Sequence, residues 1–127
     1  RISELSISVA AAGMAIIRLD ELNLHHVPLY SELVKFLIAR QDADGGWGEP
    51  MTSALALRAL LASSGNGVTI DRAIAYLATL QKDDGLWPAI PMRRMPGDTL
   101  VTAFVLYQLA ERSCFTFTSN FIFRASS

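Results

Sequence analysis

The chain has 127 residues, of which 51% are hydrophobic, and a formal net charge of −1 from 11 basic and 12 acidic residues. This size and hydrophobic content predict one folded domain with a buried core and exclude a disordered chain. Because positive charge is neither in excess nor gathered in a stripe, the sequence argues against nucleic-acid binding.

Cysteine usage and hydropathy restrict the location of the chain. Cys114 is the single cysteine, so the sequence offers no internal disulfide, no thiolate zinc site and no CxxC redox pair. The longest apolar run covers residues 9–17, about half of the ~20 residues that a membrane-spanning helix needs. We therefore expect no transmembrane segment and a cytoplasmic location, with peripheral membrane association left open.

The first part of the chain predicts two helices. Apolar residues spaced by three or four along residues 2–19 indicate a helix, in which Gly13 and its alanine neighbours would let a second helix approach closely. Pro28 is favoured in a first helical turn and opens a second helix, predicted over residues 28–41. The buried stripe of this second helix is predicted to consist of Leu29, Leu33, Phe36, Leu37 and Arg40.

Two further helices are predicted in the middle of the chain. The third covers residues 51–62, which follow a proline and are rich in alanine and leucine, with Thr52 or Ser53 as the expected N-cap. A Ser-Ser-Gly-Asn-Gly run then ends this helix. The fourth covers residues 69–81, and Thr69 is its expected capping residue.

A proline-rich loop, a fifth helix and an unusual tail complete the chain. Asp98 is a natural N-cap for the fifth helix, predicted over residues 98–112. Residues 113–127 are predicted to form an irregular apolar tail, because their phenylalanines alternate as in a strand inside an otherwise helical chain. Three interpretations stay open: a distorted sixth helix, an arm that docks on a partner, and an aggregation-prone segment.

The most informative pattern in the sequence is a repeat. The run from Gln41 to Trp47 reads Gln-Asp-Ala-Asp-Gly-Gly-Trp, and forty residues later the run from Gln81 to Trp87 reads Gln-Lys-Asp-Asp-Gly-Leu-Trp. An aromatic residue and a leucine precede the glutamine at the same distances in both copies. A period near forty with helices between the copies predicts helical hairpins that bury their apolar faces by stacking.

Each copy of the repeat suits a corner between two helices. A glutamine at a helix end can bond to the open backbone groups of an adjacent helix terminus, and a tryptophan can cover that junction. The glycine between them allows a tight backbone. The aspartates are predicted to make turn hydrogen bonds rather than to bind a metal. The predicted structural repeat residues are Gln41, Gly45, Trp47, Gln81, Gly85 and Trp87.

This Q-x-x-x-G-x-W arrangement resembles the QW motif of squalene-hopene and oxidosqualene cyclases, and residues 41–49 resemble their common D-G-G-W-G-E form. The resemblance covers about residues 28–112. That family, like protein prenyltransferase beta subunits and complement thioester domains, uses an α/α toroid of about six helical hairpins. The resemblance implies an all-α fold of antiparallel helical hairpins that form part of an α/α toroid over residues 1–112. Helices one, three and five would be inner and the other two outer.

The resemblance also directs the search for a catalytic acid. Class II terpene cyclases protonate their substrate with the middle aspartate of a D-x-D-D motif, an acid strengthened by hydrogen bonding and a dry pocket. Here Asp98-Thr99 resembles the end of the family's D-D-T-A, but Met95 and Gly97 occupy the first and third motif positions. Asp98 is the one weak catalytic candidate, and helix capping is its simpler role.

Ligand-binding candidates are equally few. Arg93 and Arg94 can pair with a diphosphate or a carboxylate, because guanidinium groups bind both in bidentate fashion. Tyr107, on the fifth predicted helix, is the third candidate. His25 and His26 lack a second pair of ligands at metal spacing, so we predict neither a metal nor a cofactor.

We therefore interpret the chain as a QW-repeat helical module that is non-catalytic in this form and binds a hydrophobic or isoprenoid ligand or a protein partner. The alternative is a fragment of a class II terpene cyclase, an isomerase or lyase for a polyprenyl substrate, whose acid lies elsewhere. Because the chain begins with Arg1 about one repeat before Gln41, we expect it to be a piece of a longer protein. The unfinished ring and the apolar tail predict self-association.

Overall fold

The computed structural model describes residues 2–63, 67–92 and 94–111, and within these ranges the chain is all-α, as predicted. Its five helices are α1 (Ile2–Glu21), α2 (Pro28–Ala39), α3 (Pro50–Ala62), α4 (Gly67–Leu80) and α5 (Thr99–Glu111). The described residues contain no β-strand, only one isolated antiparallel bridge between Trp87 and Asp98. Arg93, Cys114 and the predicted tail lie outside the described residues.

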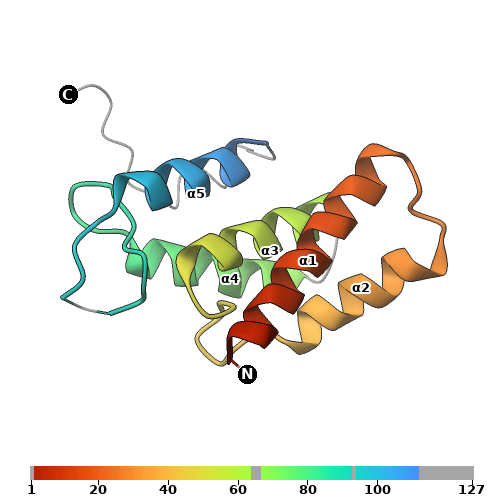
Figure 1. Ribbon diagram of the computed structural model, residues 1–127, viewed down its shortest axis with the longest axis horizontal. Coiled ribbons are helices and arrows are strands. Elements are labelled where there is room, and N and C mark those ends of the chain that lie inside the picture. The colour runs from red at the N-terminus through yellow and green to blue at the C-terminus, as the bar shows by residue number, and fades with distance from the viewer. Residues whose placement is uncertain (1, 64–66, 93, 112–127) are drawn as a thin grey trace.

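The helices form antiparallel hairpins in two layers (Figure 1). α1 and α2 run in opposite directions, as do α3 and α4. α3 is the central helix, because it packs against α1 on one side and α5 on the other. α2 packs on α1 and touches α3, while α4 packs on α3. Helices α1, α3 and α5 therefore form one layer, and α2 and α4 lie behind it. Continuation of these layers into a ring stays a prediction.

The hydrophobic core is centred on α3. This helix is buried on almost every side, and its core residues are mostly small or aliphatic, a composition typical of a helix enclosed by neighbours. The predicted close approach at Gly13 is confirmed, because a Cβ atom there would lie 3.5 Å from the Leu55 Cγ atom of α3. Fully buried side chains from all five described helices meet in this core, among them Ile16, Leu37, Leu57, Leu60, Leu77 and Val105.

The predicted stripe of α2 was partly wrong. Leu37 is fully buried, but Leu29 is 52% exposed and Tyr30 is buried in its place. The buried face follows Tyr30 and Leu37, seven residues and two turns apart, and Leu29 lies about 100° away from that line. Arg40 is exposed because the helix ends before it, and its guanidinium group stacks over the Phe36 ring at 4.5 Å.

The predicted N-caps were right in one of three helices. Asp98 caps α5, since its Oδ1 atom accepts a hydrogen bond from the Val101 backbone N–H at 3.0 Å. α3 is capped by Glu49, one residue before the helical proline, and not by Thr52 or Ser53. α4 begins at Gly67, so Thr69 lies inside the helix and is buried there. Both errors have the same cause. Pro50 and Gly67 were interpreted as helix breakers, but each is the first residue of its helix.

Candidate functional site

The two repeat corners, residues 41–47 and 81–87, have equivalent backbone structures. The Gln41 Nε2 atom donates a hydrogen bond to the Gly45 carbonyl at 2.9 Å, and Gln81 Nε2 donates to the Gly85 carbonyl at 2.9 Å. Both glycines adopt a positive φ, 97° at Gly45 and 90° at Gly85, a region that other residues rarely adopt. In both corners the glutamine therefore bonds to a carbonyl of its own turn, and the glycine supplies the positive φ of that turn.

The tryptophans of the two corners also have matching surroundings. The indole Nε1 atom of Trp47 donates to the Leu37 carbonyl at 2.9 Å, and that of Trp87 donates to the Leu77 carbonyl at 2.8 Å. Leu37 and Leu77 lie near the ends of α2 and α4, and each of these carbonyls also accepts a backbone hydrogen bond from a residue just beyond its helix. Both indoles are almost completely buried. Each tryptophan thus closes the end of the helix that precedes it.

A second hydrogen bond to each tryptophan was missed from the sequence. The Trp47 backbone N–H donates to Ser53 Oγ at 2.7 Å, and the Trp87 N–H donates to Thr102 Oγ1 at 2.7 Å. The chain separations differ because the loop over residues 88–97 enlarges the second copy. A sequence signal for these bonds was available: a hydroxyl residue stands four positions after the acidic N-cap in both copies. Ser53 follows Glu49 in this way, and Thr102 follows Asp98.

The first corner is also a contact between successive hairpins. Arg72 on α4 donates from Nη2 to the carbonyls of Asp42 and Ala43, at 3.1 and 2.7 Å. The Gln41 Nε2 atom donates to the Thr69 carbonyl at 3.0 Å. A Cβ atom on Gly45 would overlap the Arg72 carbonyl oxygen. Gly45 is therefore needed both for its φ and for the close approach of α4.

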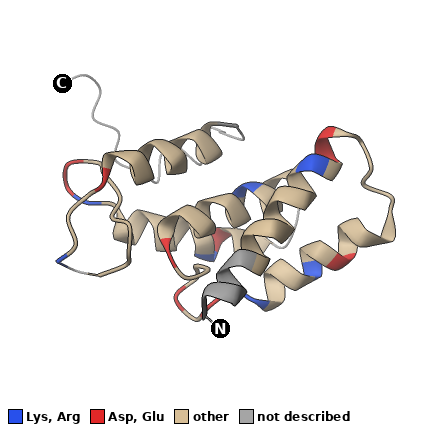
Figure 2. Cartoon of the chain, viewed as in Figure 1, with Lys and Arg blue, Asp and Glu red and all other residues tan. Residues whose placement is uncertain are grey.

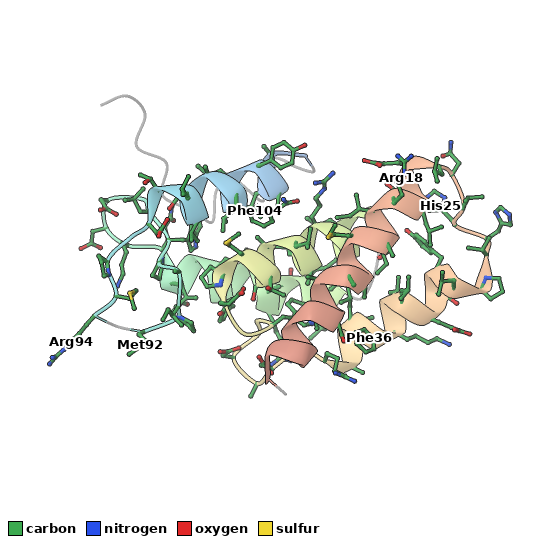
Figure 3. The ribbon with its side chains drawn as sticks, viewed as in Figure 1. Arg18, His25, Phe36, Met92, Arg94 and Phe104 are labelled. Atoms are coloured by element: carbon green, nitrogen blue, oxygen red, sulfur yellow. The ribbon has the colours of Figure 1, made fainter. Side chains whose placement is uncertain are left out.

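A groove with a volume of about 630 Å³ lies between α1, α3 and α5, and we call it the inner groove. Its apolar part consists of α1 residues together with Leu55 from α3 and Phe104 and Tyr107 from α5. Figure 3 shows Phe104 on α5 and Arg18 near the end of α1. The α1 contribution is Met14, Ala15 and Ile17. Met14 is 60% exposed and Tyr107 is 58% exposed, so apolar surface is open to a ligand there.

One end of the inner groove is polar. Arg58 on α3 donates from Nη1 to the Oε1 atom of Gln108 at 2.8 Å, and Gln108 is buried. The Arg58 Nη2 atom lies 4.0 Å from the Oε2 atom of Glu21. The other carboxylate oxygen of Glu21, Oε1, forms an ion pair with Arg18 at 3.3 Å. The guanidinium carbon of Arg58 lies 5.8 Å from the centre of the Tyr107 ring. The Arg58 side chain is only 13% exposed.

The structure places the predicted site residues apart from one another. Tyr107 lines the inner groove. Arg94 is exposed on the loop over residues 88–97 and points away from the helices (Figure 3). Asp98 caps α5 and is not among the residues that line the groove. Arg93 lies outside the described residues. Sequence reasoning missed Arg58, the side chain that connects α1, α3 and α5.

Two features are absent from the described part of the chain. None of its helices combines the length and the apolar character needed to cross a membrane. Among the same residues, no three histidine, cysteine or acidic side chains come together in a way that would hold a metal ion.

A scan against models of known protein families found no match, and searches of curated proteins and of solved structures found no similar chain.

Proposed function

We propose that this chain is a repeat module of the α/α-toroid type that binds an apolar ligand in the inner groove and does not itself catalyse a reaction. The observation that carries the proposal is the position of the groove. It lies on the layer formed by α1, α3 and α5, the helices that the resemblance to squalene cyclases assigns to the inner wall of a toroid.

The lining of the inner groove suits an apolar ligand. Small-molecule sites in proteins are concave, measure about 300–1,000 Å³, and combine apolar walls with a few polar groups. The inner groove, at about 630 Å³, falls in this range. Met14, Leu55 and Phe104 supply apolar wall, and the polar groups are confined to the end near Arg58.

The matching corners support the QW-repeat part of the proposal. In both copies the glutamine donates to the glycine carbonyl and the indole donates to a carbonyl near the end of the preceding helix, so the sequence repeat corresponds to a structural unit. Units of this kind stack on their neighbours in repeat proteins, and Arg72 makes such a contact between the first corner and the second hairpin.

The alternative, a class II terpene cyclase fragment, has less support. Asp98 is occupied as a helix cap, and among the described residues Glu21 is the acidic one that lines the inner groove. Glu21 is 50% exposed and ion-paired with Arg18, whereas the cyclase acid needs a dry pocket. Incubation of the chain with squalene and with geranylgeranyl diphosphate tests this alternative. Cyclised product from these 127 residues would contradict the non-catalytic proposal.

Binding is tested with N-phenyl-1-naphthylamine, a neutral fluorophore that brightens in apolar sites. The test variant is Met14→Asp, which places a charge on the wall of the inner groove. The control is Val68→Asp on α4, which is outside the groove lining and 68% exposed, compared with 60% for Met14. We expect Met14→Asp to raise the Kd at least about tenfold, because an unpaired charge beside an apolar ligand is costly. Val68→Asp is expected to leave the Kd unchanged. A wild-type chain that leaves the fluorophore dim would contradict the proposal.

A further inference from the structure

We propose that the exposed face of α2 is a self-association surface, on which a second copy of this chain packs its own α2 in the opposite direction. The centre of the contact is Phe36. This interaction goes beyond ligand binding, because no residue of α2 lines the inner groove. Two observations support it: the way in which α4 is covered one repeat later, and the order of charges along α2.

The equivalent face of α4 is an interface within the chain. Thr69, Ala73 and Tyr76 lie on one side of α4, since they are spaced by three or four residues, and all three are buried. The first corner covers them. The Thr69 carbonyl accepts the hydrogen bond from Gln41. The Tyr76 ring lies so close to Gly46 that a Cβ atom on this glycine would overlap it.

The corresponding face of α2 is more open. The two repeat copies are forty residues apart, and the equivalent indole hydrogen bonds to Leu37 and Leu77 place α2 and α4 in the same register. The counterparts of the three covered α4 residues are Leu29, Leu33 and Phe36. Leu29 is 52% exposed, and the other two are only partly buried. Continuous apolar surface of this kind marks an interaction site.

A hollow beside this face gives room for a partner. It has a volume of about 320 Å³ and lies between α1 and α2. Ser8, Ala11 and Ala12 of α1 form one wall, and Leu33 and Phe36 of α2 form the other. Because the side chains on the α1 wall are small, a bulky side chain of a second molecule can fill the space that they leave.

The charges of α2 are placed symmetrically about Phe36. α2 and its C-cap contain three charged residues, Glu32, Lys35 and Arg40 (Figure 2). Glu32 stands four residues before Phe36 and Arg40 four residues after it, which is about 6 Å along the helix in each direction. Four residues are close to one helical turn, so both charges lie on the face of Phe36. The Arg40 guanidinium group indeed stacks on the Phe36 ring.

This order of charges fits a second copy of the same helix. When two α2 helices pack in opposite directions about a two-fold axis through Phe36, Glu32 of each copy meets Arg40 of the other. Two ion pairs then flank the contact between the two Phe36 rings. In a parallel pair, each Glu32 would face the other Glu32. Two-fold dimers in which both copies use the same surface are the commonest homo-oligomers.

Charge reversal tests this contact at two exposed residues. The Kd of dimerisation is measured for the full chain by analytical ultracentrifugation. Glu32→Arg and Arg40→Glu each place two like-charge pairs in the contact, so we expect each variant to raise this Kd at least about tenfold. The double variant Glu32→Arg with Arg40→Glu restores both pairs with exchanged signs, and its Kd is expected to return close to the wild-type value. A wild-type chain that is monomeric throughout the micromolar range would overturn the proposal.

A mixture of the two single variants tests the two-fold symmetry. In the mixture one chain has positive charge at both positions and the other has negative charge at both, so every pair between unlike chains is attractive. We expect a heterodimer with a Kd close to that of the wild type. Arg94→Glu, a charge reversal on the exposed loop over residues 88–97, is the control and is expected to dimerise like the wild type. Circular dichroism checks that each variant folds.

Two further results would contradict the proposal. If the single variants dimerise as tightly as the wild type, the chain associates through another surface. If their mixture dimerises no better than either variant alone, the two copies do not meet through Glu32 and Arg40. Neither result bears on the inner groove, since both variants lie outside its lining.

Discussion

Gly45 is constrained both by its positive φ and by the close approach of the Arg72 backbone. Adding a single Cβ atom at this position therefore tests the structure of the first corner. We expect Gly45→Ala to lower the free energy of unfolding by at least about 1–3 kcal/mol, because alanine resists a φ of 97° and its Cβ atom would overlap the Arg72 carbonyl oxygen. Urea denaturation measures the change. The control is Gly67→Ala, where a Cβ atom meets nothing within 4 Å and stability is expected to hold or rise slightly. Equal effects of the two substitutions would contradict the described corner.

The buried hydroxyl group of Thr102 is expected to stabilise the fold, because it accepts a hydrogen bond from the Trp87 backbone N–H. Thr102→Val keeps the shape of the side chain but leaves the buried Trp87 N–H without its acceptor, which costs about 1–3 kcal/mol. Thr102→Ser retains the hydroxyl group and serves as the control. Thermal or urea denaturation of the two variants should rank valine well below serine. Ser53→Ala in the first corner is expected to have an effect of similar size, since Ser53 makes the equivalent hydrogen bond.

Tyr76 predicts a pH dependence of stability. Burial raises the pKa of Tyr76 from 10.0 to about 12 in the folded chain. Between these values the folded chain keeps a proton that the unfolded chain has lost. The resulting stabilisation is complete below pH 10 and disappears as pH rises towards 12. Denaturation of wild type and Tyr76→Phe at several pH values should show this loss in the wild type only. A tyrosinate absorbance titration that places Tyr76 near 10 would contradict the account.

At the scale of helices, Arg72 joins the first corner to α4. It donates hydrogen bonds to two carbonyls of the corner and, from Nη1, to the Gln41 side chain at 3.2 Å. We expect Arg72→Met to lower the free energy of unfolding by about 1–2 kcal/mol, because these donors serve backbone carbonyls and not another surface charge. Arg94→Met, on an exposed loop, should change it by less than about 0.5 kcal/mol. Urea denaturation compares the two, and equal changes would show that Arg72 does not hold the hairpins together.

The helices themselves could be predicted from the sequence because their periodicity is strong, whereas their ends were less predictable. Pro50 and Gly67 each open a helix, although both residues also break helices, so composition alone did not decide between these roles. The corner residues were predictable because the repeat displays them twice. Ser53 and Thr102 were not, because the long loop in the second copy hides their equivalence and the hydrogen bond appears only when the chain is folded.

The inner groove could not be located from the sequence for a related reason. Its polar end joins Glu21, Arg58 and Gln108 from three different helices, and no local pattern records which helices become neighbours. Tyr107 was singled out as a candidate and does line the groove, while Arg94 was singled out for its charge and lies far from it. The position of a residue on a predicted inner helix therefore indicated the groove lining better than the charge of a loop residue did.

At the scale of the whole molecule, the first corner joins successive hairpins, and the inner helices form the groove in which we propose that a ligand binds. α3 makes both possible, since it packs against α1, α4 and α5. The family resemblance, the ring that it implies and self-association stay predictions. The groove, in contrast, can be tested on this chain alone.

The most direct test uses the four methionines as probes. Met14 lines the inner groove, whereas Met92 and Met95 lie on the remote loop over residues 88–97 and Met51 lies outside the groove lining. The chain is labelled with ¹³C at the methionine methyl groups and titrated with 1-dodecanol while its NMR spectrum is recorded. We predict a saturable shift that is largest for the Met14 methyl group and absent for Met92 and Met95. No shift at Met14, or an equal shift at Met92, would contradict the account.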